Sequence, residues 1–117
     1  MIYHITSHIA WSEAQSNGAY TAPSLDTEGF IHCSTLEQVL PVANTFYTGQ
    51  SGLCLLIIEP ALLTAELKWE PPSGGAPPPG VPEGLMFPHV FGSINLNAVV
   101  KVVDLESTDG KFTLPDF

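Results

Sequence analysis

The 117-residue sequence predicts an α+β domain with a mostly mixed sheet. Segments typical of strands outnumber those typical of helices, and the helical segments come early in the chain. With 44% hydrophobic residues, the chain is long enough to bury one core and too short for two ordinary domains. We therefore expect residues 1–117 to form a single domain.

The N-terminal part predicts a strand, a helix and a second strand in that order. Residues 1–6 are rich in β-formers, and Ser7 suits the cap of a helix over residues 8–18, which ends at Asn-Gly. After a polar connection, residues 29–32 (GFIH) favour another short strand.

A second helix is expected over residues 35–49. Ser34 and Glu37 have the Ser-x-x-Glu spacing of a capping box, and apolar residues follow at helical intervals. Pro41 removes one internal hydrogen bond, so we expect it to bend this helix.

Strands dominate the rest of the chain. The continuous apolar run at 53–59 is typical of a central strand buried on both faces. A single helical turn is expected after Pro60, and the Pro/Gly-rich segment 71–84 excludes regular structure. That segment is either a flexible lid or a tolerated insertion. Further strands are expected at 67–70, 98–105 and 112–114.

The charge balance excludes two classes of partner. Twelve acidic residues face only three lysines and no arginine, for a net charge of -9. Nucleic acids and anionic membranes both require a cationic surface that this acidic chain lacks. A phosphate in a ligand would have to be held by backbone N–H groups, histidines or hydroxyls.

Nothing in the sequence marks the chain for export or for a membrane. Its N-terminus has no basic segment followed by a long apolar run, and the run at 53–58 is too short to cross a bilayer. We expect a cytoplasmic protein in which Cys33 and Cys54 are reduced, partly buried thiols.

Three of the four histidines are candidates for a shared site. His4, His32 and His89 each lie in apolar sequence at the end or edge of a predicted element, whereas His8 is expected on a helix surface. A single histidine so placed is more often a hydrogen-bonded structural residue, but three together favour a site. His32 and His89 are candidate general acid–base residues near neutral pH, and His4 a candidate for orienting a ligand.

Hydroxyls and acids complete the candidate set. Ser34 and Thr35 precede the second helix, whose free N–H groups favour anions, and either hydroxyl can bind a ligand. Glu70 ends a predicted strand before two prolines, where it can orient a histidine or contact a ribose hydroxyl. Glu28 has the same two options, although a solvated acid is the commoner case.

A zinc site is disfavoured. The histidines and Cys33 are suitable ligand types, but no two of them have the short paired spacing of structural sites. Alternation along the strand also places Cys33 on the face opposite His32, and nothing marks its thiol as activated. We therefore expect no metal site.

Four motifs, YHIT, EGFIHCST, WEPP and FPHVFG, occur in this order along nearly the whole chain. Together they resemble a bacterial family of proteins of unknown function, domain-of-unknown-function family 952, whose members are sometimes labelled glutathione S-transferase domain proteins. That family is grouped with ADP-ribosyltransferase-like folds. The resemblance therefore implies a small mixed or antiparallel split sheet around a cleft, with NAD as one candidate cofactor.

The resemblance also implies roles for single residues. YHIT is similar to the Tyr-His-Gly-Thr motif that holds nicotinamide and its ribose, which points to His4, with Ile5 in place of the glycine. Ser34 and Thr35 are similar to a Ser-Thr position on the second strand of such folds. By the same resemblance, His89 lies on the remaining wall of the cleft. The usual catalytic glutamate has no counterpart, and Phe91 stands where close relatives have tyrosine.

The label glutathione S-transferase has no support in the residues. The chain has about half the length that such a two-part protein needs, and its early strand-helix-strand order carries no Cys-x-x-Cys.

The leading hypothesis is a histidine-lined cleft that binds a nucleotide-like or phosphorylated small ligand. If the protein is an enzyme, ADP-ribosyltransferase-like or phosphotransferase-like chemistry is expected. The alternatives are a non-catalytic ligand-binding or protein-interaction module and a metal-binding domain. The sequence does not select among ligands or oligomeric states.

Overall fold

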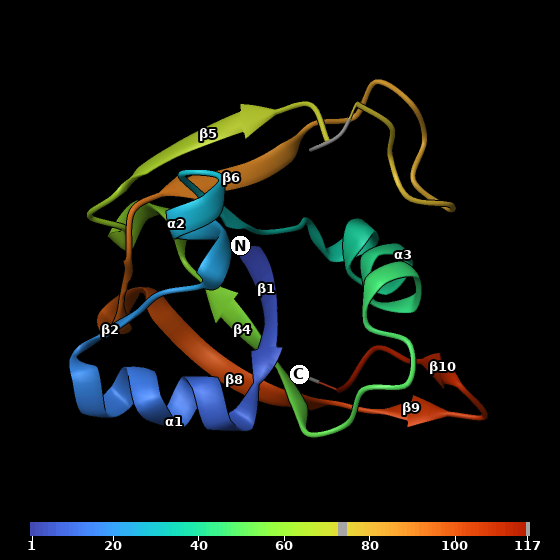
Figure 1. Ribbon diagram of the computed structural model, residues 1–117, viewed down its shortest axis with the longest axis horizontal. Helices are drawn as coiled ribbons and strands as arrows, with labels where there is room; N and C mark the ends of the chain where they lie inside the picture. Colours follow the sequence, from blue (N-terminus) through green and yellow to red (C-terminus); the bar gives the residue numbers. More distant parts are fainter. Residues whose placement is uncertain (73–74, 117) are drawn as a thin grey trace.

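The structure, a computed structural model, describes residues 1–72 and 75–116 (Figure 1). In that part of the chain, helices and antiparallel strands combine as the predicted α+β class requires. Every strand pair described is antiparallel, so no parallel pairing of a mixed sheet occurs there. The helices are α1 (His8–Asn17), α2 (Pro23–Thr27) and α3 (Leu36–Phe46), with 3-10 turns at η1 (Pro60–Leu62) and η2 (Leu96–Ala98). The strands are β1 (Ile2–Ser7), β2 (Ala19–Tyr20), β3 (Ile31–His32), β4 (Leu53–Ile58), β5 (Glu66–Glu70), β6 (Phe87–Phe91), β7 (Ile94–Asn95), β8 (Val99–Leu105), β9 (Ser107–Thr108) and β10 (Lys111–Phe112).

The first main sheet has the strand order β1–β4–β8. β4 is buried along its whole length, which confirms the expectation from its continuous apolar sequence. One face of the sheet packs against α1 through Ile2, Ala14 and Ile58, and the other against α3 through Ile5 and Val39. Because β1 lies at one edge of this sheet, its outer edge is open for other contacts.

The second main sheet has the order β3–β6–β5, and among the described residues its backbone pairs with that of the first sheet at one point. Tyr3 of β1 and Ser34 form an isolated antiparallel bridge, with N–H to O distances of 2.8 and 2.7 Å. Beyond this bridge the two sheets separate. The result is a divided sheet in which β1 and the end of β3 are neighbours at one bridge only.

Pro88 lies inside the central strand β6, a position where proline is rare. The Cys33 N–H donates to the Pro88 carbonyl over 3.0 Å. The backbone nitrogen of Pro88, which carries no hydrogen, therefore faces Cys33 as well. A non-proline residue there would donate back to Cys33 and extend the ladder. β3 therefore ends at His32, and the chain is free to cross to β1 at Ser34.

The two longer helices begin near the expected positions. Ser7 caps α1, and its hydroxyl accepts from the Ala10 N–H over 3.0 Å, as predicted. The predicted cap of α3 was wrong by one residue, because the N-cap is Thr35 rather than Ser34. The side chain that reaches back is Gln38 and not Glu37, and its Oε1 accepts from the Thr35 N–H over 2.9 Å. Thr-x-x-Gln satisfies the same free donors as Ser-x-x-Glu.

Two further elements differ from expectation. The polar connection after α1 contains α2, which starts at Pro23 because proline is pre-organised for the first helical turn. The segment over residues 87–91 forms a full strand. Of the Pro/Gly-rich segment 71–84, residues 71–72 and 75–84 carry no helix or strand, and 73–74 lie outside the described residues.

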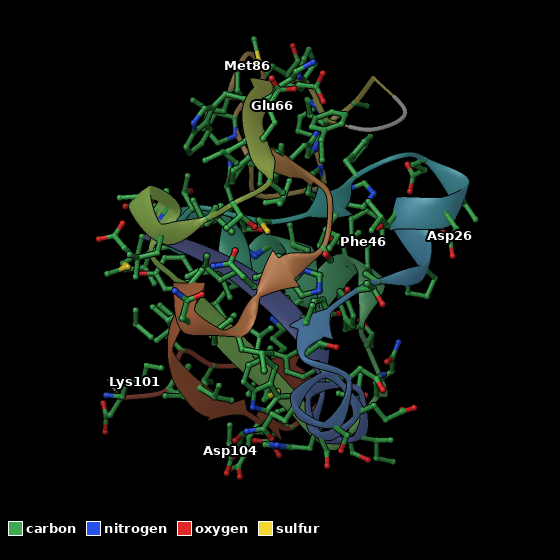
Figure 2. All side chains as sticks on the ribbon, turned by 90° about the vertical axis from the view of Figure 1, so that its left-hand side faces the viewer. Asp26, Phe46, Glu66, Met86, Lys101 and Asp104 are labelled. Atoms are coloured by element: carbon green, nitrogen blue, oxygen red, sulfur yellow. The ribbon has the colours of Figure 1, made fainter. Side chains whose placement is uncertain are left out.

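The charged side chains labelled in Figure 2 lie on several sides of the molecule. Figure 2 shows Glu66 and Met86 at the top of the view, at the second sheet, and Lys101 and Asp104 at the bottom, on β8. Among the described residues, no helix is long and apolar enough to cross a membrane.

Candidate functional site

A cleft of about 680 Å³ opens where the two main sheets separate. β1, β2, β3, α3 and β6 all contribute to its walls. Its polar residues come from the ends of the strands, and much of its remaining wall is apolar. The polar residues include Tyr3, His4, Thr6, Tyr20, Glu28, His32, Ser34, Gln50 and His89, and the apolar wall includes Ile5, Val42, Phe46, Leu53 and Phe87.

The open edge of β1 borders this cleft. Tyr3 directs its backbone N–H and C=O outward to Ser34, so by the alternation of an antiparallel pair Ile5 directs its own outward too. Neither group of Ile5 has a hydrogen-bond partner within the described residues. The Ile5 side chain packs toward α3, so it leaves this donor and acceptor accessible from the cleft.

Two histidine–carboxylate pairs stand side by side on the second sheet. His32 and His89 are register partners on β3 and β6, and their ring centroids are 5.4 Å apart. The His32 Nε2 lies 2.8 Å from the Glu28 Oε2, and the His89 Nδ1 lies 2.9 Å from the Glu70 Oε1. The structure thus brings together two histidines from segments 57 positions apart in the sequence.

Burial distinguishes the two pairs. The His32 side chain is 41% exposed, whereas the His89 side chain is 2% exposed and stacks on Phe30, with ring centroids 4.1 Å apart. Because Glu70 accepts the proton of Nδ1, a neutral His89 carries no proton on Nε2. Within the described residues that nitrogen has no hydrogen-bond partner, so it is available as a proton acceptor.

His4 is buried and fully engaged by the protein. Its Nδ1 bonds to the His32 carbonyl, and its Nε2 lies 2.8 Å from the Tyr20 hydroxyl, which in turn lies 2.9 Å from the Thr6 hydroxyl. Burial lowers the pKa of His4 from 6.5 to about 4, so the ring is neutral near pH 7.

Neutrality fixes the direction of these hydrogen bonds. A carbonyl only accepts, so the proton of His4 sits on Nδ1 and Nε2 accepts from the Tyr20 hydroxyl. The Thr6 hydroxyl is then left to donate to the Tyr20 oxygen. His4 therefore ties β1 to β3 and has no ring nitrogen left for a ligand.

The remaining candidates are divided between the cleft and its surroundings. Ser34 lines the cleft and is 6% exposed. Thr35 is the N-cap of α3 and does not line it. Glu70 does not line it either, and acts on it only through His89.

The two thiols are unsuited to act as nucleophiles, although Cys33 contributes to the lining of the cleft. Cys33 lies in the core on the face opposite His32, as alternation predicted, and burial raises the pKa of its thiol to about 12. Burial also raises the pKa of Cys54 to about 11. Both are free thiols, and thiols this weakly acidic are poor nucleophiles.

No metal site is evident in the described part of the chain, where no cluster of three histidine, cysteine or acidic side chains could hold an ion. Each of the two carboxylates is bonded to its own histidine, Glu28 to His32 and Glu70 to His89.

The sequence alone did not reveal Tyr20, Thr6 or Phe30 as parts of the site. Tyr20 lies on a two-residue strand with no recognisable pattern, and only the fold brings it to His4. Thr6 has the one available signal, because two-residue alternation places it on the same face of β1 as His4. Phe30 stands in the EGFIHCST motif and supports His89 through ring stacking.

The chain belongs to the family described as "Protein of unknown function (DUF952)", whose model matches residues 5–102. A solved relative supports this assignment: the crystal structure of protein CC0527 from Caulobacter crescentus has 32% sequence identity and a TM-score of 0.79. That comparison covers 96% of this chain and 92% of the other. The solution NMR structure of CC0527 gives 31% identity and a TM-score of 0.75, covering 95% and 89% of the two chains. A search of curated proteins found no match.

Proposed function

We propose that the cleft binds a nucleotide-like or phosphorylated small molecule and that His32 and His89 exchange protons with it during group transfer. One observation carries the proposal, namely the two histidine–carboxylate pairs that stand side by side on the cleft wall. Neighbouring imidazoles suit a reaction in which one accepts a proton while the other supplies one. His89 is the base, because Glu70 orients it, and the more exposed His32 is the acid.

The free backbone groups of Ile5 support a ligand with a planar amide or nucleobase edge. A donor and an acceptor side by side match such an edge, and a nicotinamide or a nucleobase carries one. The divided sheet around the cleft is in keeping with an ADP-ribosyltransferase-like fold, and NAD is a candidate ligand on both grounds. The amide edge would meet Ile5, with the reacting end near the two histidines.

The charge of the cleft limits how a phosphate would be held. No lysine or arginine occurs among the described residues that line it. Phosphate oxygens would therefore bind to protonated histidines, to the Ser34 hydroxyl and to backbone N–H groups. This predicts weaker binding of a bare phosphate than of a ligand that also uses the Ile5 edge.

The test is calorimetric titration of the protein with NAD, ADP-ribose, nucleotides, sugar phosphates and inorganic phosphate. We expect one of the organic ligands to bind, and the affinity to fall at least tenfold in the double variant His32→Gln/His89→Gln. His8→Gln is the matched control, because His8 forms a 2.8 Å pair with Asp104 away from the cleft. Absence of binding across the panel, or equal loss in the control, contradicts the proposal.

A non-catalytic ligand-binding or protein-interaction module is the second candidate. The lack of lysine and arginine in the described lining of the cleft favours it, because transfer of a phosphorylated group normally recruits such cations. Binding of a panel ligand without any conversion in overnight incubations, followed by mass spectrometry, would select this candidate. In either case we place the protein in the cytoplasm, where the free thiols of Cys33 and Cys54 stay reduced.

A further inference from the structure

We infer that Ser34 is a nucleophile for acyl transfer, with His89 as its base and Glu70 as the residue that positions the base. The inference rests on the proposed role of His89 as a proton acceptor, and it is independent of a nucleotide ligand. It adds a covalent step and a substrate class, a small uncharged ester.

Ser34 lies at the junction of a strand and a helix. Its backbone N–H and C=O are both bonded to Tyr3, which holds the residue in place, and α3 begins two residues later. Although only 6% of Ser34 is exposed, its hydroxyl has no hydrogen bond within the described residues and it lines the cleft. No buried side-chain nitrogen or oxygen of the described residues lacks a hydrogen-bond partner, so this unbonded hydroxyl is accessible to a ligand from the cleft.

Ser34 and His89 line the same cleft, and the register of the second sheet indicates that the hydroxyl lies toward His89. His32 opposes His89 and the Cys33 N–H bonds to Pro88, so Ser34, which lies just beyond the end of this pairing, follows on the side of Phe87. Ser34 and His89 are then diagonal neighbours on the same face of the sheet, within reach of a long side chain. Glu70 opposes Phe87 from β5 on the other side.

Glu70 prepares His89 for the role of base. Its Oε1 accepts from the Nδ1 over 2.9 Å, which leaves the Nε2 of the neutral ring as the proton acceptor. A serine, a histidine and a carboxylate bonded to the far ring nitrogen are the three parts that activate a serine hydroxyl. The stack with Phe30 fixes the ring plane.

The first turn of α3 can stabilise the oxyanion of the reaction. The Thr35 N–H is bonded to Gln38, but the N–H groups of Leu36 and Glu37 have no partner among the described residues. The first N–H groups of a helix point away from it and favour negative charge. They follow Ser34 by two and three residues, so the oxygen of a substrate carbonyl attacked by Ser34 lies in their direction.

The reaction steps follow from these positions. The Ser34 Oγ attacks the ester carbonyl carbon and gives its proton to the His89 Nε2. The bond to the alkoxy group then breaks, and that group leaves with the proton as an alcohol. Water, losing a proton to His89, attacks the acyl-serine, and the Ser34 Oγ recovers that proton as the acid departs. The net reaction is ester plus water giving acid plus alcohol.

The walls of the cleft favour an uncharged, apolar acyl group. Val42 and Phe46 of α3 and Leu53 of β4 supply apolar surface, and the described lining holds no lysine or arginine for an anionic substrate. A small aryl ester is therefore a suitable probe.

The test is incubation of the full chain with p-nitrophenyl acetate, followed by peptide mapping by mass spectrometry. We expect nitrophenol release with transient acetylation of Ser34, both lost in Ser34→Ala and retained in Ser51→Ala, a control at an exposed loop position. Acetylation at another residue, or nitrophenol release unchanged by Ser34→Ala, overturns the inference.

A second variant distinguishes loss of reactivity from loss of folding. Glu70 is 37% exposed at its side chain, so Glu70→Gln is expected to keep the melting temperature within a few degrees. Acetylation of Ser34 should slow by at least about tenfold in this variant, because His89 loses its orienting carboxylate. An unchanged rate and pH profile would exclude Glu70 from this role.

Acetylation of Ser34 without any nucleotide binding would reject the proposed ligand class and keep this inference. Nucleotide binding without acetylation of Ser34 would reject this inference and keep the proposed ligand class.

Discussion

Acid should destabilise this protein through His4, and the structure gives the size of the effect. The folded-state pKa of His4 is about 4, against 6.5 for an ordinary histidine. A histidine with a lowered pKa binds its proton more readily in the unfolded chain. Its contribution to stability is therefore complete above pH 6.5, is lost as the pH falls toward 4, and is absent below that.

The magnitude follows from the difference between the two pKa values. A drop from 6.5 to about 4 is about 2.5 pKa units, and each unit corresponds to about 1.4 kcal/mol. The free energy of unfolding should therefore fall by about 3 kcal/mol between pH 7 and pH 4 on account of His4. Protonation also breaks the accepting role of Nε2 toward Tyr20, so the loss has a direct structural cause.

The assay is urea unfolding at pH 7 and pH 4 for the wild type and for His4→Gln. The variant should be less stable than the wild type at pH 7. Between pH 7 and pH 4, however, its free energy of unfolding should fall by about 3 kcal/mol less than that of the wild type. The two proteins differ at this residue alone, so the contributions of all other groups cancel in the comparison. If both proteins lose the same free energy on acidification, the assignment of a neutral buried His4 is refuted.

Three further predictions follow from the core and its contacts. Cys33 and Cys54 should react with Ellman's reagent at pH 8 only after unfolding, because burial raises both pKa values to about 11 or 12; rapid reaction of the native protein would contradict this. Gln38→Ala should lower the free energy of unfolding in urea by about 1–3 kcal/mol, since its buried amide bonds to both the start of α3 and the carbonyl before β6. Gly92→Ala should destabilise the protein, because the new Cβ would lie 2.9 Å from the Cβ of Ala65, and the double variant with Ala65→Gly should recover most of the loss. A double variant no more stable than Gly92→Ala alone would disprove that contact.

Local sequence patterns were sufficient for much of the fold. The continuous apolar run of β4 predicted a central strand, and Ser7 predicted the start of α1. The cap of α3 was misplaced because Ser34 and Thr35 both precede suitable partners at the right spacing. Tertiary contacts decided between them, since Ser34 is bonded to Tyr3 through its backbone and Gln38 also bonds to Met86.

For the candidate site, too, the sequence determined one part and the tertiary structure the other. The sequence by itself determined which residue types were available: three histidines in apolar surroundings, an acidic chain without arginine, and a helix start beside His32. Only the tertiary structure decided their roles, because a histidine's chemistry depends on what its two nitrogens contact. His4 has both nitrogens engaged, whereas His32 and His89 each have a carboxylate on one. Apart from the contact of His32 with Glu28, which lies four residues earlier, these contacts join segments far apart in the chain, and no local pattern encodes them.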